Sequence, residues 1–226
     1  MLDLTSKKGR IVSAALGLAA ERPWRDVGLA DIAARAGTSL AMLRTHFAGK
    51  SEILAAFTRL VDDEVLRRAP RLDDTQARRD ALFEVVMSRF DVLEPYKGAL
   101  KSIVGHGLPE PGQILPILAS QRWMLEAAGI RADGIDGSVR VAGLMSVYAA
   151  VFRTWLDDND AGLARTMAAL DRRLRRGERT MQRMDDVCQG VSRMSDAIFG
   201  ALRGAKAKAP SSPAEPASPA PQPPSL

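Results

Sequence analysis

Apolar residues recur every three or four positions along most of this chain, and short segments rich in glycine, proline or aspartate interrupt them. This spacing places apolar side chains on one face of a helix, and no segment alternates apolar and polar residues over the length of a strand. Besides the motif described next, the pattern predicts an all-α chain with helices over residues 7–21, 51–68, 77–93, 97–104, 112–127, 137–156, 162–175 and 178–203, the last two separated at Gly177.

Residues 29–50 predict two short helices joined by a tight turn. The first has apolar residues at helical spacing, at Leu29, Ile32, Ala33 and Ala36. Gly37 supplies the positive φ that ends a helix sharply, and Thr38 or Ser39 is placed to cap the next helix. The buried face of that second helix is predicted at Leu40, Leu43 and Phe47. Because this is the geometry of a helix-turn-helix, DNA binding is the leading hypothesis.

The distribution of charge supports that hypothesis. The chain carries a net charge of +5, and residues 1–50 hold eight Lys and Arg against four Asp and Glu. Nearly all the excess positive charge therefore falls on the segment with the helix-turn-helix pattern, where it can neutralise phosphates. The last 23 residues are rich in Pro, Ala and Ser and are expected to be disordered, because they cannot bury enough apolar area.

Composition excludes several other classes of function. The single cysteine, Cys188, allows no intramolecular disulfide, which favours a reducing cytoplasm. No apolar run approaches the roughly 20 residues that span a bilayer, and no signal peptide is recognisable, so no membrane partner is expected. We find no Ser/His/Asp order, phosphate-binding glycine loop or metal-spaced ligands, so we expect neither an enzyme nor a metal or cofactor.

The N-terminal quarter resembles the TetR family of bacterial transcriptional regulators. The matching residues run from Ile11 to Ala15, Leu29 to Ala33, Ala36 to Ser39, His46 to Phe47 and Lys50 to Leu54. The resemblance implies a helix-turn-helix head at residues 1–50 and a helical body at 51–203 that binds a ligand and forms a homodimer, followed by the tail at 204–226. It further implies a repressor whose affinity for double-stranded DNA falls when a small molecule binds.

The resemblance also implies which residues meet DNA: Thr38, Ser39, Leu40, Ala41, Met42, Arg44, Thr45, His46 and Lys50. This recognition helix departs from the family pattern, because most members have an aromatic at the place of Arg44 and a small or polar residue at Leu40. Arg44 can grip phosphate or pair with guanine, whereas Ala41 and Met42 can touch only thymine methyls or sugars. Direct reading of bases is therefore expected to be weak.

Candidate ligand contacts lie on the apolar faces of the body helices. They are Phe83, Met87, Phe90, His106, Gln121, Met124, Met145, Tyr148 and Phe152. Methionine and aromatic side chains adapt to varied apolar shapes, although each is more often simply core. No buried charge is evident among these helices, so an apolar or weakly polar small ligand is expected, with His106, Gln121 and Tyr148 as polar anchors.

One alternative remains open at the level of sequence. The TetR fold also includes lipid-binding accessory proteins of ubiquinone biosynthesis, which do not bind DNA and carry an extra amphipathic helix. Residues 178–203 have an apolar stripe of helical spacing, but its polar face mixes Arg with Asp and Glu. A membrane-surface helix normally has a Lys/Arg-rich polar face, so docking on the body or on a second subunit is favoured.

Overall fold

The computed structural model describes residues 2, 4–69, 77–105 and 111–179, and within these ranges every regular element is helical. The predicted all-α class is confirmed. Residues 1–178 form one compact unit. The remainder of the helix predicted over residues 178–203, including Cys188, and the tail over residues 204–226 lie outside the described residues.

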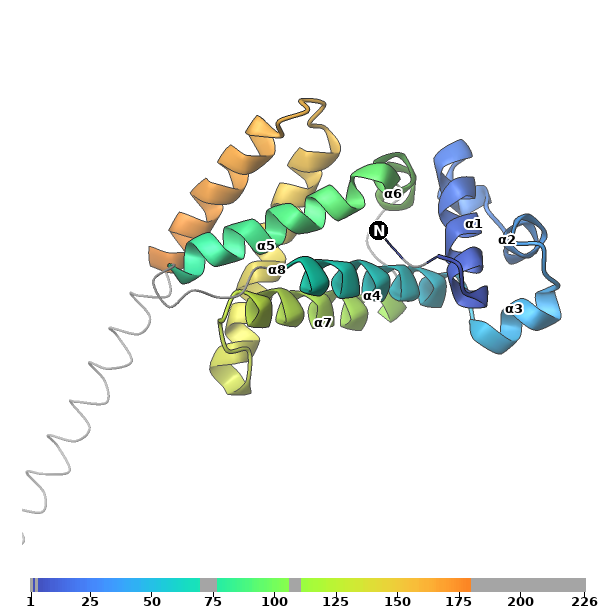
Figure 1. The fold of residues 1–226 in the computed structure, drawn as a ribbon, viewed down its shortest axis with the longest axis horizontal. Coiled ribbons are helices and arrows are strands. Elements are labelled where there is room, and N and C mark those ends of the chain that lie inside the picture. The colour runs from blue at the N-terminus through green and yellow to red at the C-terminus, as the bar shows by residue number, and fades with distance from the viewer. Residues whose placement is uncertain (1, 3, 70–76, 106–110, 180–226) are drawn as a thin grey trace, which may run out of the picture. The chain divides into compact units, whose positions relative to one another are not determined.

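The N-terminal helices form a small head. It consists of α1 (Lys7–Glu21), the short 3-10 turn η1 (Trp24–Asp26), α2 (Leu29–Arg35) and α3 (Leu40–His46). The helix α1 begins where the Ser6 hydroxyl accepts a hydrogen bond from the Gly9 N–H at 3.0 Å. The helix α1 packs on α2, as Figure 1 shows. The core of the head includes the buried residues Val12, Ile32, Leu43 and Phe47.

The helix α4 (Lys50–Arg68) leads from the head into the body, where it packs along α7 (Pro111–Ala127) and α5 (Arg78–Leu93), as Figure 1 shows. The turn η2 (Glu94–Tyr96) joins α5 to α6 (Lys97–Val104), and α6 packs against α1 of the head. The helix α8 (Gly134–Leu156) contacts α7 and α6. The head is therefore held to the body by α4 and by α6.

Most helix bounds agree with the predicted ranges to within three residues. Gly177 is an exception, because it was expected to separate two helices and instead lies within a continuous helix over residues 164–179. An isolated glycine weakens a helix by only about 1 kcal/mol relative to alanine. The buried side chains of Leu170 and Leu174 anchor this helix to the core, so the glycine does not end it.

The surface of α8 is unusually apolar for a helix at the edge of the body. By length and composition alone it could cross a membrane, with a mean hydropathy of 1.3 over its most apolar window, of which 22% is buried. Ile135 and Val139 on this helix are 84% and 42% exposed. A Cβ atom added at Gly143 would meet no atom within 4 Å, so this part of the helix surface is unpacked in the single chain.

Candidate nucleic-acid interface and internal cavity

The turn between α2 and α3 has the geometry that the sequence predicts. Gly37 adopts φ of 64°, a conformation open to glycine but strained for most residues. The Thr38 N–H donates to the Ala33 carbonyl at 2.9 Å and the Gly37 N–H to the Ala34 carbonyl at 3.1 Å. These two bonds form a Schellman motif, which satisfies the last carbonyls of α2 and redirects the chain into α3.

Ser39 caps α3, because its hydroxyl accepts a hydrogen bond from the Met42 N–H at 3.1 Å. The helix packs into the head through Leu43 and Phe47, which are 1% and 3% exposed. Leu40 was expected on this buried face, but it is 51% exposed. It is the first residue of a seven-residue helix whose second half makes the packing contacts, so its side chain is left in solvent.

The free face of α3 carries most of the predicted DNA contacts. Ser39, Leu40, Ala41, Met42, Arg44 and Thr45 are exposed, and Thr38 and His46 are half-buried. The Thr45 hydroxyl donates to the Met42 carbonyl at 2.7 Å, which leaves its lone pairs available to accept a hydrogen bond. Arg44 makes no hydrogen bond or ion pair with another described residue. The face thus offers one mobile cation among short or apolar side chains.

Lys50 lies away from this face. Its Nζ donates to the Trp24 carbonyl at 2.7 Å and to the Val27 carbonyl at 2.8 Å, and it sits 4.3 Å from the centre of the Trp24 ring. The backbone N–H of Trp24 donates to the Ser102 hydroxyl at 2.9 Å. That hydroxyl donates in turn to the Arg22 carbonyl at 3.1 Å. Lys50 of α4 and Ser102 of α6 thereby both form hydrogen bonds with the same segment of the head.

Ion pairs on the surface of the head brace α2 against α1. Arg35 forms two parallel hydrogen bonds to Glu21, at 2.8 and 2.6 Å, the bidentate geometry that suits a guanidinium and a carboxylate. Asp31 accepts the Gly28 N–H at 2.9 Å and pairs with Arg22 at 2.6 Å. The Gly28 N–H is the main cause that lowers the pKa of Asp31, and Arg22 adds to it. These exposed pairs orient α2 rather than contribute much stability.

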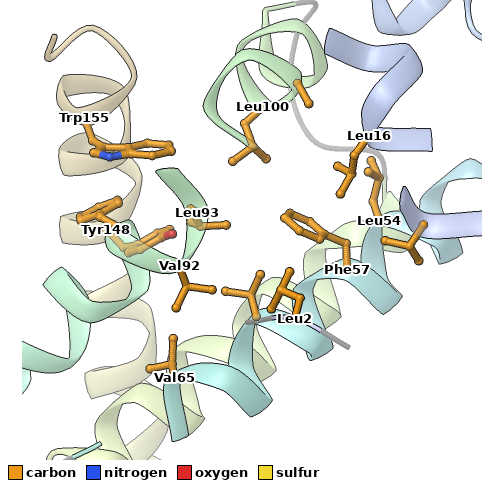
Figure 2. Packing of buried hydrophobic residues seen from close by; sticks show 14 of the residues in the cluster. Leu2, Leu16, Leu54, Phe57, Val65, Val92, Leu93, Leu100, Tyr148 and Trp155 are labelled. Carbon is orange, nitrogen blue, oxygen red and sulfur yellow. The ribbon is translucent and has the colours of Figure 1, made fainter. Parts of the chain in front are cut away.

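A partly open cavity of about 580 Å³ lies between α4, α5, α6, α7 and α8. Its wall is mainly apolar and includes Phe57, Leu93, Leu100 and Tyr148, whose side chains surround the centre of Figure 2. At the head end the wall includes Trp24 and Lys50. Trp24 and Lys50, which take part in the contact between head and body, therefore also line the cavity. Its volume falls within the range of about 300–1,000 Å³ that is typical of small-molecule sites.

A buried polar cluster lies at the cavity. Arg89 of α5 forms an ion pair with Asp62 of α4, and both side chains are less than one tenth exposed. The Arg89 Nε donates to the Tyr148 hydroxyl at 3.1 Å, and the Ser120 hydroxyl donates to Asp62 Oδ1 at 2.6 Å. Burial raises the pKa of Tyr148, which keeps its O–H protonated. Burial opposes the charge of Arg89, but the Tyr148 and Asp62 oxygens outweigh it and raise the pKa of Arg89.

This cluster corrects the expectation that the body buries no charge. Arg89 lies four residues after Val85 and seven after Leu82, on the same face of α5 as these buried residues. Asp62 lies on the buried face of α4 beside Val61 and Val65. A cation on the core face of one helix and an anion on the core face of its neighbour are the signal that could have revealed the pair from sequence.

The structure divides the predicted ligand contacts into two groups. The cavity is lined by Gln121, Met145, Tyr148 and Phe152. The other predicted contacts that are described pack in or against the hydrophobic core and do not line this cavity: Phe83, Met87, Phe90 and Met124. Phe90 stacks on Tyr148 with ring centroids 5.6 Å apart, so it supports the wall from behind. His106 lies outside the described residues.

Comparisons with known proteins agree with this geometry. Residues 11–57 match the family model described as bacterial regulatory proteins, tetR family. The fold is shared with a TetR transcriptional regulator from Nitrosomonas europaea ATCC 19718 at 24% identity, over 76% of this chain and 98% of that chain, with a TM-score of 0.59. It is also shared with a TetR transcriptional regulator from Rhodococcus sp. RHA1 at 18% identity, over 76% and 94% of the two chains, with a TM-score of 0.56. No curated protein matches the chain in sequence.

The family match covers the capped turn and both helices of the motif, where the predicted DNA contacts lie. The two solved relatives extend the likeness in fold to the helical body. Neither comparison supports the lipid-binding alternative. At its N-terminus the chain therefore carries a segment that matches the tetR family of bacterial regulatory proteins, and it shares the fold of two solved TetR transcriptional regulators.

Proposed function

We propose that this protein is a DNA-binding transcriptional regulator of TetR type, a ligand-responsive repressor that binds its operator as a homodimer in the cytoplasm. In each subunit α3 enters a major groove, and the two heads meet half-sites separated by about 34–36 Å or a multiple of it. The observation that carries the proposal is the pairing of an exposed α3 face with an internal cavity whose wall includes the head-to-body contacts. The proposed DNA-binding face and the proposed ligand cavity are thereby connected through contacts within one chain.

The proposed DNA contacts are the residues on and beside the free face of α3. Arg44 supplies the charge, and Leu40 and Met42 supply apolar contacts for thymine methyls or sugars. Thr38, Ser39, Ala41, Thr45 and His46 are close enough in sequence to reach the same stretch of backbone and groove. Since Lys50 is held by two carbonyls and the Trp24 ring, we assign it to the connection between head and body instead.

The proposed dimer interface is formed by α8 and the helix over residues 164–179. Ile135 and Val139 of α8 and Met167 of the next helix are large apolar side chains that are exposed in the single chain. Gly143 leaves room for the close approach of a second helix. Pairing of two subunits would cover this surface, which accounts for the high hydropathy of α8 without a membrane.

Ligand binding is proposed to act on the DNA-binding head through the hydrogen bonds that Lys50 and Ser102 form with Trp24. A molecule that fills the cavity presses on walls contributed by α4 and α6, and both helices contact the head segment around Trp24. A ligand that binds more tightly to a conformation with displaced heads shifts the population toward it. The two α3 helices then no longer match the spacing of the half-sites, and repression weakens.

Substitution Arg44→Ala tests the assigned face of α3. The variant is expected to bind operator DNA less tightly by about 1–3 kcal/mol, because it loses a charged contact and leaves the packing of α3 on Leu43 and Phe47 intact. If the contact is to phosphate, the loss is uniform across sequences and the salt dependence of log K falls by about one. Fluorescence anisotropy with DNA from upstream of its own gene, over a salt series, measures both quantities.

Arg78→Ala provides the matched control, because Arg78 is an exposed arginine at the start of α5 and its removal changes the net charge equally. This control should bind DNA as the unaltered protein does. Equal affinities of the Arg44→Ala and Arg78→Ala variants at every salt concentration would remove Arg44 from the interface.

A further inference from the structure

Gln121 in the cavity wall has an unsatisfied hydrogen-bond acceptor. The residue is 1% exposed, and its Oε1 has no hydrogen-bond partner. Its Nε2 donates to the Ile117 carbonyl at 3.4 Å, one turn earlier in α7. In this orientation the amide nitrogen faces that carbonyl and Oε1 has no donor. A buried acceptor without a partner has lost its hydrogen bond to water, so a ligand that donates to it gains affinity.

The polar groups of the buried cluster at this wall are paired with one another, except for one donor. Asp62 accepts from both Arg89 and Ser120, and Arg89 also donates to Tyr148. Because the Tyr148 oxygen accepts from Arg89, its own O–H remains as a donor that a ligand oxygen can accept. The wall therefore offers an acceptor on α7 and a donor on α8, the two complements of a hydroxyl group.

The charges around the cavity disfavour an ionised ligand group in its interior. Asp62 compensates the charge of Arg89, and two carbonyls and the Trp24 ring hold the ammonium of Lys50. The two remaining cations of the wall, Arg25 and Arg153, are exposed to solvent. Among the described residues no Asp or Glu lines the cavity, so a cationic ligand finds no counter-ion. The free Gln121 oxygen repels a carboxylate.

We propose that the cavity takes an uncharged, largely apolar aromatic compound with a hydroxyl group, which donates to Gln121 Oε1. The aromatic side chains of Trp24, Phe57, Tyr148 and Phe152 in the wall suit an aromatic body. Phenols meet this description at neutral pH, since an unperturbed phenol has a pKa of about 10. This inference rests on the proposed function in one respect, that the cavity is the site of the regulatory ligand.

Four probes with one octyl chain and different head groups test the proposal by calorimetric titration of the full-length protein without DNA. They are 4-octylphenol, its methyl ether 4-octylanisole, 4-octylbenzoate and 4-octylbenzylammonium. The ether keeps the oxygen but carries a methyl group in place of the hydroxyl hydrogen, so it cannot donate. Because one net hydrogen bond contributes about 0.5–1.5 kcal/mol, we expect 4-octylphenol to bind about two- to twelvefold more tightly than the ether. The two ionised probes should bind more weakly than the phenol.

The variant Gln121→Leu keeps the approximate volume and removes the acceptor. It should bind 4-octylphenol and 4-octylanisole about equally, and it should fold, because it replaces an unpaired buried polar group with an apolar one. Gln113→Leu is the matched control, since Gln113 also lines the cavity from α7 and is only half-buried. In that control the preference for the phenol should persist.

Each other outcome overturns the inference: equal binding of phenol and ether, a preference that survives Gln121→Leu, tightest binding of an ionised probe, or binding of none. A parallel DNA titration keeps the proposed function separate. If the protein prefers the phenol through Gln121 but 4-octylphenol leaves DNA affinity unchanged, the ligand class stands and the ligand-responsive function fails. If DNA binding is normal and no probe binds, the ligand class alone fails.

Discussion

Substitution Asp62→Ala is expected to lower the free energy of unfolding by about 3–5 kcal/mol, because it leaves a buried charge without its partner. Asp62 is 8% exposed and Arg89 is 5% exposed. Without the carboxylate the guanidinium stays charged, because arginine cannot be deprotonated in proteins, and it remains buried without a counter-ion. Ser120 also loses the acceptor of its hydroxyl. Urea unfolding followed by circular dichroism measures the difference.

The neighbouring residue supplies the control. Asp63→Ala removes the same group from the exposed face of α4 and should change the unfolding free energy by less than about 0.5 kcal/mol. The double variant Asp62→Leu with Arg89→Met should recover most of the loss, because apolar residues of similar volume replace a buried pair at little cost. If Asp62→Ala lowered the free energy of unfolding by less than about 1 kcal/mol, water would have to reach the ion pair. That result would contradict the buried cluster.

Substitution Gly143→Arg is expected to weaken operator binding by about 10²–10⁴-fold, through loss of the second head. The single chain has space for the new side chain, since a Cβ at Gly143 meets no atom within 4 Å. In the proposed dimer the same position faces a second helix, so a long charged side chain separates the subunits. Analytical ultracentrifugation should then find monomers, and the salt dependence of DNA binding should fall to about half, because half of the phosphate contacts are lost.

Gly98→Arg provides the corresponding control on α6, where an added Cβ likewise meets nothing within 4 Å. It adds equal bulk and charge on a helix outside the proposed interface and should leave the protein dimeric. A Gly143→Arg variant that remains dimeric would place the interface elsewhere on the surface and contradict the role assigned to α8.

Most of the fold was predictable because helix positions and helix ends follow from local patterns in the sequence. Helical spacing identified the elements, and Gly37 identified the turn, since a positive φ at the end of a helix is a strong demand on residue type. The same rules placed Ser39 as a candidate cap. Gly177 shows their limit, because the packing of neighbouring leucines outweighed the weak helix propensity of one glycine.

The site was less predictable, because contacts between distant segments form it. Lys50 belongs to the sequence pattern of the head, yet its ammonium turns toward Trp24, 26 residues earlier, and this cannot be read from spacing. Phe90 and Tyr148 both lie on the apolar face of a predicted body helix, but only Tyr148 lines the cavity. Periodicity indicates that a residue faces inward and does not indicate whether it meets another side chain or an empty space.

Cleavage of DNA from a reagent tethered to α3 tests the central claim most directly. In a Cys188→Ser background, Ala41→Cys gives a single thiol on the exposed face of α3, to which an iron chelate is attached. The account predicts two clusters of cleavage on operator DNA, about 34–36 Å apart or at a multiple of that distance. The same chelate on Arg78→Cys, at the start of α5, should leave the DNA intact. Intact DNA with the α3 tether, or cuts only from the α5 tether, would contradict the assignment of α3 as the helix that enters the groove.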